Sequence, residues 1–340
     1  MTGPPAPASP ETTLEPGYVV ATGTCLPDHL SDVGGKAVGL GSLLRAGQRV
    51  PASFVITAAA HRDHLAAPAS GLSPAVRESV TAAYSALAKR CGGDLPVAVR
   101  SSAAAEDSTD ASYAGQFRTF LGAFGIEEIL AQVQQCWIAA SDPRVSSYRA
   151  GREQRANAGG VAVIVQEMVD ARAAGVLFTQ HPRTGDRSLV VIESSYGLGE
   201  AVVGGEVIPD LFEVNRITRR IHRSRLGAKS VEHRLAPDGR AVRTVPVEAA
   251  RQDAWSISDE EISTLVALAA QLEARLGRGL DVEWAIGTTP SAGGEEALFA
   301  LQARPITVLP DRPPAASPNV DAVDHILGRL SGRRPEDGAR

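Results

Sequence analysis

Two mostly apolar segments lie towards the C-terminal end of the sequence, residues 280–286 and 297–304, and apolar residues alternate with polar ones over 280–284 and 301–304. Such alternation is typical of strands with one covered face, because successive side chains of a strand point to opposite sides. The segment between them, residues 287–296, is rich in Gly, Thr and Ser, which predicts a connecting loop. The pattern therefore predicts two strands that pair as a hairpin.

One face of this predicted hairpin collects polar side chains. Asp281 and Glu283 share a face of the first strand, and Gln302 and Arg304 share a face of the second. If the strands close directly at the loop, Asp281 falls opposite Gln302 and Glu283 lies one step away. The oxygen atoms of this set suit Mg²⁺, and the guanidinium suits a phosphate. A solvated strand face with a cross-strand Asp–Arg pair fits the same pattern.

Helical and extended periodicities alternate through the rest of the chain, which predicts an α+β protein. Residues 258–261 read Ser-Asp-Glu-Glu before an apolar repeat, which is the pattern of a capping box at a helix start. The expected helices cover residues 57–64, 73–91, 126–140, 141–155 and 258–276, and the expected strands cover residues 51–57, 161–168, 174–179 and 188–193, with a hairpin over 211–225.

Two segments in the first half combine small residues with a basic side chain. Gly34 and Gly35 precede Lys36 and an apolar helical pattern, so Lys36 is expected in the first turn of a helix, where free N–H groups and positive charge favour a phosphate. Further on, an apolar strand ends at Arg100 and two serines, before a small polar loop of the kind that folds over an anion. An ordinary surface lysine and an ordinary strand–loop–strand connection are the alternatives.

Composition limits the classes of function. The chain has 340 residues, of which 44% are hydrophobic, and this supports a large core in two lobes or domains. Its apolar runs are far shorter than the roughly 20 residues of a membrane span, and residues 1–16 are expected to be a disordered tail and not a signal peptide. A net charge of −5 argues against nucleic acid as a partner. Cys25, Cys91 and Cys136 lack metal-like spacing, which is typical of reduced thiols in the cytoplasm.

Seven segments, taken in order, resemble the nucleotide-binding domain of phosphoenolpyruvate synthase, a domain that pyruvate phosphate dikinase and rifampicin phosphotransferase also carry. The resemblance spans about residues 17–309. It implies an ATP-grasp fold of α+β type in which two lobes, residues 17–185 and 186–309, clamp Mg-ATP, followed by a Pro-rich tail over residues 310–340. The segments are residues 34–36, 97–115, 166–168, 178–185, 195–200, 281–284 and 301–305.

The resemblance also implies roles for single residues. Lys36 and Arg100 would hold the nucleotide phosphates, and Arg304 would hold the terminal ones. The residues implied to bind Mg²⁺ are Glu283, Gln302 and Asp281, and those implied to line the adenine pocket through backbone groups are Gln166, Glu167 and Met168.

The multidomain relatives pass phosphate through a histidine on a swivelling domain. None of the seven histidines of this sequence lies in a Thr-Ser-His-Ala-like loop, and a short Pro-rich segment follows Arg304, so a relay within the chain is not expected. The expected activity is direct transfer of the γ-phosphoryl group of ATP to a hydroxyl or amine of a small molecule, with ADP as product. The acceptor suggested is an antibiotic such as an aminoglycoside, or a biosynthetic intermediate.

A second interpretation stays open beside the first. In it, the chain is a nucleotide-binding module that phosphorylates a histidine on a separate carrier partner. For direct transfer, an acidic side chain near the phosphates would take the proton of the acceptor. The candidates for this base, all in polar loops, are Glu106, Asp107 and Glu200.

Overall fold

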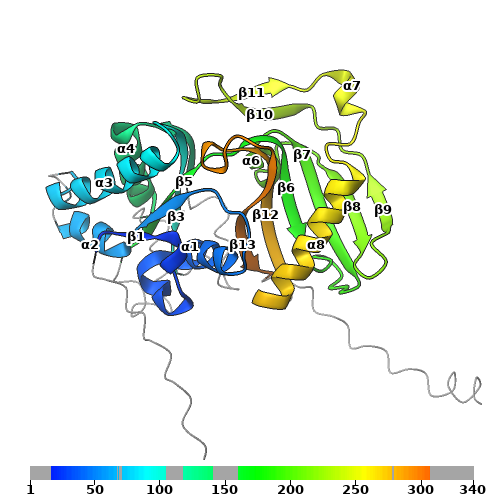
Figure 1. Cartoon of the computed structure of the whole chain (residues 1–340), viewed down its shortest axis with the longest axis horizontal. Helices are drawn as coiled ribbons and strands as arrows, with labels where there is room; N and C mark the ends of the chain where they lie inside the picture. Colours follow the sequence, from blue (N-terminus) through cyan, green and yellow to red (C-terminus); the bar gives the residue numbers. More distant parts are fainter. Residues whose placement is uncertain are drawn as a thin grey trace, which may run out of the picture.

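Two antiparallel β-sheets form the framework of the protein in the computed structural model (Figure 1). The structure describes residues 17–66, 68, 71–104, 118–140, 160–277 and 279–306. Several expectations fall outside these residues, namely the helix over 141–155, the loop with Glu106 and Asp107, and the tails over 1–16 and 310–340.

The first sheet has the strand order β1-β2-β5-β3-β4. Its helices come from the same N-terminal part of the chain, and they lie on the left in Figure 1, in blue to green. The strands are β1 (Val19–Ala21), β2 (Ser53–Ile56), β3 (Pro96–Ser102), β4 (Thr119–Phe124) and β5 (Ala162–Glu167), and the helices are α1 (Leu30–Arg45), α2 (Ala58–Ala66), α3 (Pro74–Arg90) and α4 (Ile126–Ala140).

The second sheet has the order β13-β12-β6-β7-β8-β9, and α8 crosses one of its faces (Figure 1). A separate two-stranded hairpin, β10–β11, lies at the top of the same view. The strands are β6 (Asp170–Phe178), β7 (Leu189–Tyr196), β8 (Asp210–Asn215), β9 (Ile221–Arg225), β10 (Val231–Leu235), β11 (Val242–Pro246), β12 (Leu280–Thr288) and β13 (Ala297–Pro305), and the helices are α6 (Glu200–Val203), α7 (Ala249–Gln252) and α8 (Asp259–Leu276).

The start of α8 confirms the expected capping box. The Ser258 hydroxyl accepts a hydrogen bond from the Glu261 N–H at 3.3 Å, and the Glu261 carboxylate accepts one from the Ser258 N–H at 2.7 Å. Both otherwise unpaired amides at the helix start are thereby satisfied. The buried side chains of α8 recur every three or four residues, for example Leu265, Leu268 and Leu272, so the helix covers the sheet with one apolar stripe.

The pairing of β12 with β13 corrects the expected register. Asp281 lies opposite Arg304, and Glu283 lies opposite Gln302, whereas the sequence had placed Asp281 opposite Gln302. The hairpin closes one residue later than expected, and a β-bulge between Glu283 and Trp284 shifts the register again. Such an extra residue changes which side chains stand opposite one another without ending the ladder.

The largest apolar cluster of the described residues contains side chains from both sheets. It includes Val55 and Ile164 of the first sheet, Ile192 and Val282 of the second, and Leu40 of α1, all with 1% of their surface exposed or less. Burial of apolar surface in one shared cluster stabilises the two sheets against each other. The sheets divide between β5 and β6, and the lobe boundary expected at residue 185 stays a prediction.

Candidate functional site

A cavity of about 420 Å³ is lined by residues of both sheets. From the first sheet, β3, β4 and the end of β5 contribute, and from the second, β6, β12 and β13, together with α6 and the loop before it. The lining residues are Ala98, Arg100, Thr119, Leu121, Gln166, Glu167, Met168, Val169, Ala171, Gly175, Leu198, Gly199, Glu200, Val203, Gly204, Glu283, Trp284, Ala285 and Leu301. The cavity thus brings together sequence-predicted residues that lie far apart along the chain.

Arg100 connects the two sheets at this cavity. Its Nη2 atom donates to the Glu283 carboxylate at 2.9 Å and to the Gln302 side-chain oxygen at 2.8 Å. The Arg100 and Glu283 side chains are only 13% and 20% exposed. Glu283 and Gln302 stand directly opposite each other in the β12–β13 ladder, which places both oxygens within reach of one guanidinium.

The charges around Glu283 keep its carboxylate ionised. Burial raises the pKa of Glu283, but the Arg100 guanidinium, with smaller effects from Lys36 and Arg304, more than offsets this and leaves the pKa below its usual value. Three cationic side chains from three different elements therefore act on one carboxylate. This concentration of positive charge in a partly enclosed site favours an anionic ligand.

Lys36 follows a kink inside α1. Gly34 has φ +76°, and a Cβ there would lie 2.2 Å from the Ser102 carbonyl oxygen, so only glycine fits beside β3. Further contacts join this segment to β3, because the Gly35 N–H donates to the Ala103 carbonyl at 3.1 Å and the Lys36 ammonium donates to the Ser101 carbonyl at 3.3 Å. The expected loop opening a helix at the glycine pair was wrong, because α1 already begins at Leu30, but Gly34 interrupts the helix with a kink. Lys36 follows this kink and lies beside the strand that carries Arg100.

Arg304 and Asp281 form an ion pair on the same face of the hairpin. Arg304 Nε donates to an Asp281 carboxylate oxygen at 2.9 Å, and its Nη2 atom lies 2.9 Å from the same oxygen. The Arg304 side chain is 44% exposed, which leaves its guanidinium accessible from solvent. The four polar residues of the hairpin therefore share a face as predicted, although their partners across the ladder differ.

The end of β5 forms a second, less charged part of the cavity. The N–H groups of Glu167 and Met168 already donate to the carbonyls of Ala52 and Pro96, so backbone recognition by these two residues would use their carbonyl oxygens. Gln166 pairs with Ala98 of β3 and shares its face. Its side chain is buried, and its Nε2 atom has no hydrogen-bond partner. A buried amide donor on a cavity wall is poised to meet an acceptor on a ligand.

The Glu167 side chain has a structural role that the sequence did not reveal. Its carboxylate accepts from the Ala52 N–H at 3.2 Å, from the Ser291 N–H at 2.9 Å and from the Ser291 hydroxyl. It therefore joins β5 to the loop between β12 and β13. No local signal distinguishes this buried glutamate from a surface one, because both partners are distant in sequence.

Apolar residues complete the wall near β5. Leu121, Met168, Leu198 and Leu301 belong to one apolar cluster and also line the cavity. Leu121, Leu198 and Leu301 were not predicted as site residues from the sequence. Leu198, inside the glycine-rich segment 195–200, carried the nearest signal, since an apolar residue in such a loop needs a packing partner.

The described histidines lie outside the cavity lining. His181 organises a turn, because its Nδ1 atom accepts from the N–H groups of Arg183 and Thr184 at 3.1 and 3.3 Å. His233 lies behind Glu200, with its Nε2 atom 3.1 Å from the Glu206 carboxylate.

Glu283 and Gln302 suit a magnesium ion that a bound ligand also helps to coordinate. In the described part of the chain, no group of three or more His, Cys, Asp and Glu side chains is arranged to hold a metal alone. Glu283 does supply an ionised carboxylate, and Gln302 opposite supplies an amide oxygen. Because Mg²⁺ commonly takes one or two carboxylates and completes its shell with water and phosphate oxygens, this donor set is adequate for an ion that a phosphate-bearing ligand also binds.

An apolar wall beside converging cationic groups is the arrangement of a nucleotide-binding domain. Comparison with known families supports this class, because the family described as pyruvate phosphate dikinase, AMP/ATP-binding domain, matches residues 68–324. The chain belongs to this family.

Three curated relatives show how much of a larger protein the chain resembles. It is 35% identical over 311 residues to a probable phosphoenolpyruvate synthase of Archaeoglobus fulgidus, covering 82% of this chain and 40% of the relative. It is 35% identical over 313 residues to a rifampicin phosphotransferase of a Streptomyces species, covering 82% and 35%. It is 37% identical over 290 residues to the prodigiosin synthesizing transferase PigC of Serratia marcescens, covering 81% and 31%. The chain thus spans well under half the length of these relatives.

Among solved structures, a D-alanyl-alanine synthetase A from Vibrio cholerae aligns over 88% of this chain and 67% of its own, with a TM-score of 0.32 and 8% identity. Among the described helices, none has the length and apolar character needed to cross a membrane.

Proposed function

We propose that the chain is an ATP-dependent phosphotransferase that binds Mg-ATP in the cavity between its two sheets, as two lobes of an ATP-grasp clamp. The observation that carries the proposal is the Arg100 bridge to Glu283 and Gln302. It joins a guanidinium, a group that commonly binds phosphate, to a carboxylate and an amide oxygen, which are groups that Mg²⁺ accepts as ligands, and Arg100 and Glu283 line the cavity. The family match to an AMP/ATP-binding domain supports the same ligand.

The adenine base is proposed to lie at the β5 end of the cavity. There the wall is apolar, which suits a flat aromatic ring, and the buried Gln166 amide offers an unpaired donor for a ring nitrogen. The carbonyl oxygens of Glu167 and Met168 are the backbone groups suited to accept from the exocyclic amine. The phosphates then extend towards the cationic groups on β3, α1 and β13.

Each charged residue has a distinct role in this proposal. Lys36 supplies a point charge and Arg100 and Arg304 supply planar donors to the phosphate oxygens. Glu283 and Gln302, with Asp281 nearby, would hold Mg²⁺, which when bound neutralises charge on the phosphates and orients them. On nucleotide binding, Arg100 would exchange its carboxylate partner for a phosphate, since both accept the same fork of N–H donors.

The acceptor is proposed to be a hydroxyl or amine of a small molecule. Its oxygen or nitrogen forms a bond to the γ-phosphorus while the bond from that phosphorus to the bridging oxygen breaks, and ADP leaves. Glu200 lines the cavity and its side chain is 44% exposed, so it is the described candidate for the base that takes the proton of the acceptor. An antibiotic or biosynthetic intermediate is a reasonable acceptor class, since one relative is a rifampicin phosphotransferase.

A partner carrier remains the second candidate. Since no described histidine lines the cavity, a phosphohistidine step would require a histidine supplied from elsewhere. The resemblance to probable phosphoenolpyruvate synthases is what supports this second candidate. Direct transfer needs no such group.

The test is an assay of the purified chain with γ-labelled ATP, Mg²⁺ and a panel of antibiotics and metabolites. We expect acceptor-dependent ADP and an acceptor heavier by one phosphoryl group. Formation of AMP and inorganic phosphate, or an acid-labile phosphohistidine on this chain, would overturn direct transfer. Failure to bind ATP at all would overturn the nucleotide site itself.

A further inference from the structure

The β10–β11 hairpin extends from the second sheet across to the first. At its attached end, away from the turn, the Leu198 N–H donates to the His233 carbonyl at 2.8 Å, and Gly197 forms a β-bridge with His233. The Arg251 guanidinium also bonds the Glu232 carboxylate at 2.7 Å. The attached end of the hairpin is therefore anchored beside the glycine-rich loop that lines the cavity.

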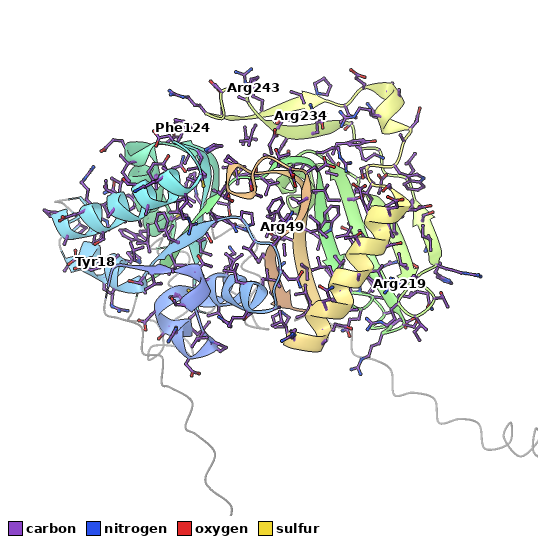
Figure 2. All side chains as sticks on the ribbon, in the orientation of Figure 1. Tyr18, Arg49, Phe124, Arg219, Arg234 and Arg243 are labelled. Atoms are coloured by element: carbon purple, nitrogen blue, oxygen red, sulfur yellow. The ribbon has the colours of Figure 1, made fainter. Side chains whose placement is uncertain are left out.

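The tip of the hairpin contacts the first sheet. The Arg240 guanidinium lies over the Phe124 ring, 4.7 Å from its centroid. Beside this pair, a Cβ built on Gly122 of β4 would lie 3.4 Å from the Ala241 backbone, so β4 and the tip are in close contact. Figure 2 shows Phe124 in the left-hand group of elements, below the hairpin that carries Arg234 and Arg243.

The two faces of the hairpin differ in character. Leu235 and Val242 pair across it and belong to the apolar cluster that includes the cavity residues Leu121, Met168 and Leu198. The opposite face carries Arg234 and Arg243, which pair with each other and are exposed. The inner face therefore packs behind the wall where the adenine base is proposed to lie.

An isolated two-stranded hairpin is marginally stable in water, so its contacts at the attached end and the tip determine where it lies. The attached end of the hairpin makes hydrogen bonds and a buried carboxylate pair, whereas the tip end contacts the first sheet through an exposed cation–π pair, small residues and the half-buried Leu235 and Val242, with no hydrogen bond among these contacts. A cation–π pair at an exposed site is weak. The tip is thus the end that separates more readily.

We propose that the β10–β11 hairpin is a roof over the part of the nucleotide site where the adenine ring is proposed to lie. Arg240 and Phe124 then form a latch that opens to let the nucleotide enter and leave. The proposal rests on the proposed function, because it concerns the same cavity. The latch does not touch the nucleotide. It controls access by holding the two sheets together above the proposed position of the adenine ring.

A gate has a specific kinetic signature. If the latch must open for both entry and exit, weakening it raises the association and dissociation rates by a similar factor and leaves Kd nearly unchanged. A contact made directly to the nucleotide would instead raise only the dissociation rate and weaken Kd in proportion. From the usual strength of exposed cation–π pairs, the expected acceleration is about 2- to 5-fold.

The experiment uses stopped-flow binding of a fluorescent ATP analogue with Mg²⁺. The variants are Arg240→Ala, Phe124→Leu and their double variant, and the control is Arg243→Ala, which removes the same charge from the exposed face of the same hairpin. We expect both rates to rise in each latch variant, no change in the control, and a double variant no faster than either single one. Amide exchange in β4 should also rise in the latch variants of the free protein.

Two outcomes separate this proposal from the function beneath it. If the wild-type chain binds no nucleotide, the proposed function fails and the roof fails with it. If the wild type binds but the latch variants keep wild-type rates, or change Kd and the dissociation rate alike, only the roof proposal is overturned.

Discussion

At the scale of single residues, the charge on Glu283 connects the parts of the site. It is the carboxylate on which Arg100, Lys36 and Arg304 all act. Replacing Glu283 with Gln keeps the size of the side chain and its hydrogen-bonding capacity but removes the charge that would offset Mg²⁺. We expect turnover of ATP to fall by at least about 100-fold, as for other losses of a preorganised electrostatic group.

The measurement for Glu283→Gln is the steady-state rate of ADP formation, with the circular dichroism spectrum as a check on folding. Glu295→Gln is the matched control, since Glu295 is exposed in the loop between β12 and β13. Near-normal turnover in Glu283→Gln would remove this residue from the site.

The same residue predicts a pH dependence of stability. Because the pKa of Glu283 is lower in the folded chain than its ordinary value near 4.5, ionisation favours the folded state. This stabilisation is complete above the ordinary pKa and is lost as the pH falls through the folded one. Urea unfolding at a series of pH values should show wild type more stable than Glu283→Gln at neutral pH, with the difference shrinking below about pH 5. A difference that grows in acid would contradict the direction of the shift.

Single residues also show what the sequence could predict about the site. Alternation within two segments was sufficient to place Asp281, Glu283, Gln302 and Arg304 on one face, because that depends only on strand geometry. Their pairing was wrong, because a bulge depends on packing between strands and leaves no local mark. Arg100 was predicted as a phosphate ligand, yet its bond to Glu283 joins residues of different sheets and is a property of the folded chain alone.

At the scale of elements, the kink at Gly34 within α1 determines where Lys36 lies. Gly34→Ala would place a Cβ 2.2 Å from the Ser102 carbonyl oxygen in addition to straining a positive φ. Gly47→Ala is a matched control, because Gly47 has φ +78° but open space around it. The control carries only the backbone strain of about 1–2 kcal/mol, and we expect Gly34→Ala to lose at least about 2 kcal/mol more by urea unfolding. Equal losses in the two variants would show that the contact with β3 is not tight.

Elements differed in how well the sequence predicted them. The helix α8 carried a capping box and a continuous apolar stripe, and both are local signals. The β10–β11 hairpin was missed, because its strand Val231–Leu235 alternates apolar residues with Glu and Arg only weakly. Its apolar partners, such as Leu121 and Leu198, come from two other parts of the fold, so packing and not propensity determines it.

At the scale of the whole molecule, a few polar groups hold the two sheets in a fixed relation. Arg100 does so at the phosphate end of the cavity, and Glu167 does so at the base end through Ala52 and Ser291. Between them, α1 packs so closely on β13 that a Cβ on Gly39 would lie 2.6 Å from the Ala303 carbonyl oxygen. The shape of the cavity therefore depends in part on groups that would not touch the nucleotide, such as the Glu167 carboxylate and Gly39.

Glu167→Gln tests this dependence. One carboxylate oxygen becomes an NH₂ group that cannot accept, so a buried donor from Ala52 or Ser291 loses its partner, at a cost of about 1–3 kcal/mol in the free energy of unfolding. Because the sheets are then less firmly joined, Kd for ATP should also rise, as measured by calorimetric titration. The control is Glu273→Gln, which weakens the 2.5 Å ion pair between Glu273 of α8 and Arg216, the residue after β8. Both residues belong to the second sheet and its helix, so this variant should lower stability without changing Kd for ATP. If both variants weaken ATP binding equally, general destabilisation and not the junction of the sheets explains the loss.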